Sequence, residues 1–96
     1  MIIRKPVPDQ PVRVVLQRAG YTEFTDPRTG QRSFIRRLGT LFYPRFHCYI
    51  RLDQSTMTID LHLDQKQPSY AGTRKHSGEY DGSTVEAEVD RVRRLL

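Results

Sequence analysis

The sequence has a single cysteine, Cys48, and no tryptophan among its 96 residues. One cysteine excludes an internal disulfide and any zinc site built from several thiolates. Apolar residues never occur in runs longer than three, which excludes a membrane-spanning helix and the hydrophobic segment of a signal peptide. We therefore expect a cytoplasmic protein with no membrane partner.

Lysine is also scarce, since three lysines stand against thirteen arginines. The net charge of +5 is concentrated in residues 1–51, which carry ten basic and three acidic side chains, whereas residues 52–96 carry six and eight. Arginine has a planar guanidinium group that binds phosphate and stacks on bases. The basic half of the chain therefore predicts an anionic partner, with nucleic acid as the first candidate.

Only 36% of the residues are hydrophobic, so we expect one domain, residues 1–96, with a thin core. Apolar residues at helical spacing predict helices over residues 11–19 and 83–96. Alternating apolar residues predict strands over residues 21–25, 32–38, 45–52 and 57–64. Residues 1–8 are expected to form an extended lead-in, and residues 65–82 a long loop. The predicted fold is an α+β two-layer sandwich, in which a single antiparallel sheet of about four strands (order α-β-β-β-β-α) has the N- and C-terminal helices on its apolar face.

The most specific pattern is a pair of alternating segments on either side of Gln54 and Ser55. If these two residues form the tip of a hairpin, Leu52 faces Met57 and every apolar residue of both strands falls on one face. A shift by one residue would destroy this agreement, so the register is well specified. Cys48 falls on the apolar face, where a thiol behaves as a small hydrophobic group.

The same register places His47 opposite His62, and Tyr49 opposite Asp60, on the polar face. His76, the third histidine, lies in the long loop that follows this hairpin. If the loop folds back, the three imidazoles meet Asp60, and this set would hold a divalent metal ion such as zinc. Alternatively, the three histidines are catalytic and act as general acid and base in a small hydrolase or ribonuclease that uses the RNA 2′-hydroxyl as nucleophile.

A third interpretation of this face is binding without chemistry and without a cofactor. Tyr49 stands between Arg45 and Arg51, and its ring would stack on a base while the arginines hold phosphates. Arg36 and Arg37, on the preceding strand, would extend the basic surface. The leading hypothesis is therefore a small basic module that binds nucleic acid, RNA in particular.

Two interpretations without nucleic acid stay open. An exposed sheet edge or loop would suit a structural or protein-interaction domain. An ordinary solvated face would also show the cross-strand pairs of Arg45 with Asp64 and of Tyr49 with Asp60, since antiparallel sheets commonly leave one face in water.

The segment Leu16–Tyr21, which ends a helix and enters a strand, resembles the N-terminal part of HicA-type toxins. Those proteins are small basic ribonucleases with a double-stranded-RNA-binding-like α-β-β-β-α fold. The family carries its catalytic histidine in a Gly-Ser-His motif, whereas this chain has Gly-Gln-Arg-Ser-Phe at residues 30–34. The resemblance therefore transfers no catalytic residue and assigns the chain to no family.

Overall fold

The computed structural model describes residues 1–65 and 82–96, which form five strands and two helices. The strands are β1 (Ile2–Pro6), β2 (Thr22–Thr25), β3 (Arg32–Arg37), β4 (Arg45–Leu52) and β5 (Thr56–Asp64). The helices are α1 (Val12–Arg18) and α2 (Gly82–Leu95). Most of the loop expected over residues 65–82, including His76, lies outside the described residues.

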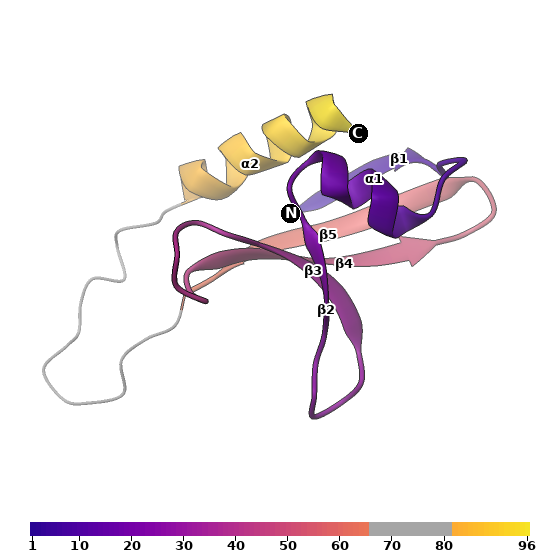
Figure 1. The fold of residues 1–96 in the computed structure, drawn as a ribbon. Helices are drawn as coiled ribbons and strands as arrows, with labels where there is room; N and C mark the ends of the chain where they lie inside the picture. Colours follow the sequence, from indigo (N-terminus) through magenta and orange to yellow (C-terminus); the bar gives the residue numbers. More distant parts are fainter. Residues whose placement is uncertain (66–81) are drawn as a thin grey trace, which may run out of the picture.

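The strands belong to one antiparallel sheet with the order β1-β5-β4-β3-β2 (Figure 1). The predicted register of the central hairpin is confirmed, because β4 pairs with β5 so that Leu52 faces Met57. Asp53 closes the tip, where its carboxylate accepts hydrogen bonds from the backbone amides of Ser55 and Thr56. The α+β class and the single antiparallel sheet thus agree with the sequence-based prediction.

The prediction is wrong for the first residues of the chain. Residues 1–8 are not an unpaired lead-in, because Ile2–Pro6 forms the edge strand β1 and pairs with β5. The sheet therefore has five strands rather than four, and α1 follows a strand instead of opening the fold. Side-chain packing and the chain terminus add to this pairing, because Ile3 is fully buried and the amine of Met1 donates a hydrogen bond of 2.7 Å to the carbonyl oxygen of Leu61.

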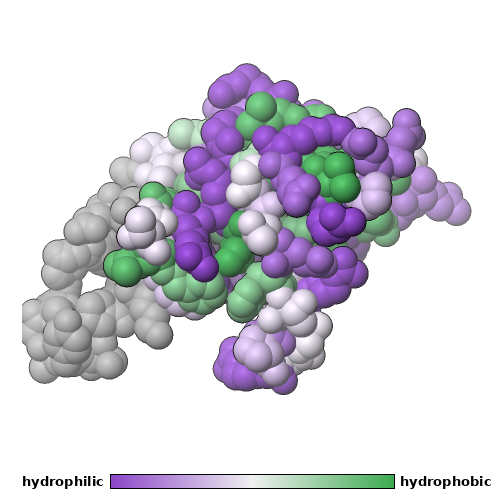
Figure 2. Space-filling model, viewed as in Figure 1, coloured by the Kyte–Doolittle hydropathy of each residue, from purple (hydrophilic) through white to green (hydrophobic). Residues whose placement is uncertain are grey.

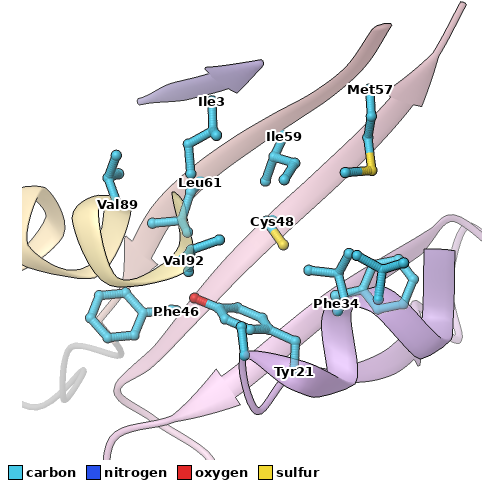
Figure 3. Packing of buried hydrophobic residues seen from close by; sticks show 13 residues of the cluster. Ile3, Tyr21, Phe34, Phe46, Cys48, Met57, Ile59, Leu61, Val89 and Val92 are labelled. Atoms are coloured by element: carbon cyan, nitrogen blue, oxygen red, sulfur yellow. The ribbon is translucent and has the colours of Figure 1, made fainter. Parts of the chain in front are cut away.

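Both helices pack on one face of the sheet, where the apolar side chains of the strands gather (Figure 3). The core consists of Ile3, Val15, Leu16, Ala19, Tyr21, Phe34, Phe46, Cys48, Met57, Ile59, Leu61, Val89 and Val92. Gly20, with a φ of +87°, follows α1 and turns the chain so that Tyr21 enters the core. The Tyr21 hydroxyl points toward α2 and donates a hydrogen bond of 2.7 Å to Glu88.

The other face of the sheet carries no helix in the part of the chain that the structure describes. Because successive side chains of a strand point to opposite faces, the polar residues of β4 and β5 project from this side. On the molecular surface in Figure 2, hydrophobic residues form separate patches among hydrophilic ones. Within residues 1–65 and 82–96, no helix has the length and apolar character needed to cross a membrane.

Candidate functional site

The candidate site is the polar side of β4 and β5, which we call the helix-free face. The register places His47 opposite His62, and Tyr49 opposite Asp60. The rings of His47, Tyr49 and His62 form a cluster with centroid separations of 4.7, 5.3 and 5.7 Å. Two imidazoles and a phenol therefore meet at the positions that the sequence predicts for them.

His47 is the buried centre of this cluster, with 8% of its surface exposed. Its Nδ1 lies 2.8 Å from Asp64 Oδ2, and its Nε2 lies 2.8 Å from the hydroxyl oxygen of Ser33 on β3. Burial lowers the pKa of His47 below its usual value and outweighs the opposing attraction of Asp64. The imidazole is therefore neutral at neutral pH.

The hydrogen-bond partners of His47 fix its tautomer. An ionised carboxylate only accepts hydrogen bonds, so Nδ1 carries the proton and donates it to Asp64. Nε2 then accepts from the hydroxyl of Ser33, for which the carbonyl oxygen of Phe24 is a second acceptor at 3.3 Å. A serine, a histidine and a carboxylate in this order also make up a nucleophilic triad, but Ser33 is only 3% exposed. Its hydroxyl is closed to a substrate, so these bonds position His47 rather than activate a nucleophile.

Arg45 is buried, although the sequence predicts an exposed contact residue. Its guanidinium Cζ lies 5.1, 4.4 and 4.5 Å from the ring centroids of Phe24, Phe42 and Tyr43. Nε donates a hydrogen bond of 3.2 Å to Asp64, and Nη1 has no hydrogen-bond partner among the described residues. The physical reason is that the connector between β3 and β4 folds over this end of the sheet, where cation–π attraction holds the charge beneath the rings.

Arg36 and Arg37 lie on opposite faces of β3. Arg36 projects toward the helices, with its guanidinium 5.7 Å from the ring centroid of Phe46 and 3.7 Å from the carboxylate of Glu88. Arg37 is exposed on the helix-free face and lies over the ring of Phe42. The sequence-based hypothesis joins the two arginines in one surface, whereas the alternation of a strand separates neighbouring residues.

Asp64 is a candidate ligand that the sequence reasoning missed. One ligand atom each from His47, His62 and Asp64 lie within 4.8 Å of one another. Asp60, the carboxylate that the sequence favours, is exposed and lies 3.9 Å from the N-terminal amine. The sequence did contain a signal for Asp64 as a ligand, because residues 62 and 64 of one strand lie on the same face of the sheet. His76 lies outside the described residues, so its participation stays a prediction.

Two exposed arginines mark the other end of the helix-free face. Arg4 on β1 and Arg51 on β4 both pair with Thr58, which lies between them on β5. Neither guanidinium forms an ion pair with another residue of the described ranges. Tyr49 is half-buried and lies on the same side of β4 as Arg51. We call Arg4, Tyr49 and Arg51 the basic end.

Comparison with protein-family models, with curated proteins and with solved structures gave no match. The chemistry of the helix-free face is therefore what bears on the function. That chemistry is divided between the basic end and the group of His47, His62 and Asp64, which we call the histidine end.

Proposed function

We propose that the protein is a small basic module that binds single-stranded nucleic acid, RNA in particular, on the helix-free face. The position of Tyr49 carries the proposal, because this half-buried ring lies on an open sheet beside the exposed guanidinium of Arg51. An aromatic ring that is accessible on the surface of a sheet allows an unpaired base to stack, and neighbouring arginines supply phosphate contacts. Stacking accepts any base, so the expected selectivity is for single strands rather than for a sequence.

The distribution of charge supports an anionic partner. Arg4, Arg37 and Arg51 are all exposed, and the strand registers put all three on this face. They join Tyr49 as the proposed contact residues. The net charge of +5 would favour the approach of a polyanion from a distance. A cytoplasmic location, where single-stranded RNA is abundant, belongs to the same proposal.

Two arginines that the sequence predicts as contact residues, Arg36 and Arg45, are not contact residues in this proposal. Arg45 is covered by aromatic rings and holds Asp64. Arg36 faces the helices and lies close to Glu88. Neither guanidinium is presented to a ligand on the open side of the sheet, so we expect their replacement to affect stability more than affinity.

Fluorescence anisotropy with a labelled single-stranded RNA, measured in EDTA over a series of salt concentrations, tests the proposal. We expect Tyr49→Ala to weaken binding by about 1–3 kcal/mol, the contribution of one stacked base. Arg51→Ala should lower the slope of log affinity against log salt by about 0.7, the contribution of one phosphate contact on a single strand. The matched control is Arg94→Ala, which removes an exposed arginine from α2, on the other side of the sheet.

Two results would contradict binding of nucleic acid on the helix-free face. One is the absence of binding to both RNA and DNA at low salt, where electrostatic attraction is strongest. The other is an equal loss of affinity in Arg51→Ala and Arg94→Ala, because general attraction to a basic protein would then explain the binding. Equal affinity for single strands and duplexes would remove the role given to Tyr49.

The paired imidazoles favour a second candidate function, a small ribonuclease. The ring centroids of His47 and His62 lie 5.3 Å apart, and the side chain of His62 is 42% exposed. A neutral imidazole can accept the proton of an RNA 2′-hydroxyl while a second imidazole, in its protonated form, donates its proton to the leaving oxygen. Gel analysis of RNA recovered from the binding experiment separates the two functions. Cleavage that His62→Ala abolishes would favour the ribonuclease, whereas intact RNA favours binding alone.

A further inference from the structure

The histidine end supports an inference that goes beyond nucleic-acid binding. We propose that His47, His62 and Asp64 form a site for one divalent transition metal ion of the zinc class. Their ligand atoms lie within 4.8 Å of one another, on two adjacent strands whose register is fixed. Two imidazoles and one carboxylate are a ligand set that Zn²⁺ takes where a fourth position stays open to water or another ligand.

The two carboxylate oxygens of Asp64 have different surroundings. Oδ2 accepts hydrogen bonds from Arg45 Nε at 3.2 Å and from His47 Nδ1 at 2.8 Å, whereas Oδ1 faces His62 Nε2 at 3.9 Å. An ion between the two imidazoles takes Oδ1, and Oδ2 keeps its hydrogen bond to Arg45. Carboxylates that bind metal ions are commonly held in this way by a hydrogen bond to the second oxygen. Arg45 therefore orients the carboxylate and leaves one oxygen for the ion.

The hydrogen bonds behind His47 suit an imidazole that binds metal. A histidine that coordinates through one nitrogen usually donates a hydrogen bond from the other. With the ion on Nδ1, the proton of the neutral imidazole moves to Nε2 and is donated to Ser33 Oγ, 2.8 Å away. The Ser33 hydroxyl then donates to the carbonyl oxygen of Phe24 at 3.3 Å.

This arrangement accounts for a feature that the metal-free hydrogen bonds leave unexplained. When Nδ1 donates to Asp64, the single hydroxyl proton of Ser33 has two acceptors, His47 Nε2 and the carbonyl oxygen of Phe24. When an ion occupies Nδ1, Nε2 instead donates to Ser33 Oγ, and the carbonyl oxygen of Phe24 is the one acceptor left for the hydroxyl proton. Neutral His47 carries one ring proton in either tautomer, so it binds the ion through Nδ1 with no net release of a proton.

The exposures of the three ligands give the ion a path from solvent. The side chain of His62 is 42% exposed and that of Asp64 is 26% exposed, whereas that of His47 is 10% exposed. His47 therefore forms the inner wall, and the ion enters past His62 and Asp64. The ligand set needs neither Asp60 nor His76, the other two residues that the sequence pattern suggests.

The test uses the untagged chain, stripped of metal with EDTA and then freed of the chelator. Isothermal titration with Zn²⁺ should show saturable binding of one ion per chain, and Co²⁺ should develop the visible absorption of a four- or five-coordinate ion. Ser33→Ala keeps all three ligands, yet it should weaken Zn²⁺ binding by about 10- to 100-fold, the usual effect of losing an outer hydrogen-bond partner. His62→Ala should reduce the affinity at least as much.

Asp60→Asn is the matched control, because Asp60 lies two residues from His62 on the same face of β5. It should bind Zn²⁺ as the wild type does. Equal losses in Asp60→Asn and His62→Ala would overturn the ligand set, and non-saturable binding or several ions per chain in the wild type would overturn the site. Circular dichroism verifies the fold of each variant, and His62→Gln replaces His62→Ala if the latter unfolds. RNA binding is measured in EDTA, so failure of the metal site is distinguishable from failure of the proposed function.

Discussion

Cys48 illustrates how burial controls the chemistry of a single side chain. The thiol lies in the core with no exposed surface, and burial raises its pKa to about 12. The thiolate is the reactive form of cysteine. The folded protein therefore keeps its one thiol both protonated and out of reach of reagents.

We expect iodoacetamide to leave Cys48 unmodified in the folded protein at mildly alkaline pH. In concentrated urea the same thiol should react at the rate of a free cysteine, because unfolding restores both its exposure and its ordinary pKa. Mass spectrometry of the intact chain measures the single adduct without ambiguity, since the sequence has no other cysteine. Rapid alkylation under native conditions would contradict the burial of this residue.

Single residues also show where prediction from sequence ends. Alternation in a strand tells on which side of the sheet Arg45 and His47 lie, and that side is correct. It does not tell that rings from β2 and from the β3–β4 connector cover Arg45. Whether the polar face of a sheet is exposed to solvent depends on the segments that pack over it. The alternating pattern of a single strand contains no information about those segments.

At the scale of whole elements, the sequence predicts the central hairpin of the sheet but not its edge strand β1. The hairpin of β4 and β5 could be predicted because its two alternating segments are adjacent and share one polar tip. β1 could not, since it ends in Pro6 and its partner β5 is the last of the described strands. These residues are extended both in an unpaired lead-in and in a strand. Whether they pair depends on β5, which is distant in the sequence.

Replacing residues of β1 measures what this edge contributes. Ile3→Ala should lower the free energy of unfolding by about 2–5 kcal/mol, because Ile3 is fully buried and its loss leaves a cavity. The matched control is Ile2→Ala, a change of the same chemistry at a side chain that is 42% exposed, which should cost less than about 0.5 kcal/mol. Urea denaturation followed by circular dichroism measures both. Equal effects would show that β1 does not pack as described.

At the scale of the whole molecule, Glu88 links α2 to the sheet. Its buried carboxylate on α2 accepts hydrogen bonds from Tyr21 and Arg91, and the guanidinium of Arg36 on β3 lies 3.7 Å away. Burial by itself raises the pKa of Glu88, but the hydrogen bonds from Arg91 and Tyr21 and the charge of Arg36 outweigh it, so the pKa is lowered. The ionised carboxylate thus holds both layers together.

The stability of the protein should therefore depend on the ionisation of Glu88. A carboxylate whose pKa is lower in the folded than in the unfolded protein contributes its full stability above the unfolded pKa and loses it as the pH falls through the folded pKa. Glu88→Gln should destabilise the protein at neutral pH by about 1.5–3 kcal/mol, the usual value for hydrogen bonds to a charged group. Urea denaturation at several pH values measures the difference, which should shrink as the pH falls below 4.5, the ordinary pKa of a glutamate carboxyl group. A difference that stays constant with pH would contradict this account.

The pairing of β1 with β5 also constrains the order of events during synthesis. β1 leaves the ribosome before β5. Ile2 therefore cannot pair with Asp60 until the intervening strands have been synthesised. Until then, the nascent chain carries an N-terminal segment without a neighbour. Among the described residues, the sheet is complete only when its first strand joins its last one, so the pairing of β1 has a long sequence separation and is expected to be slow.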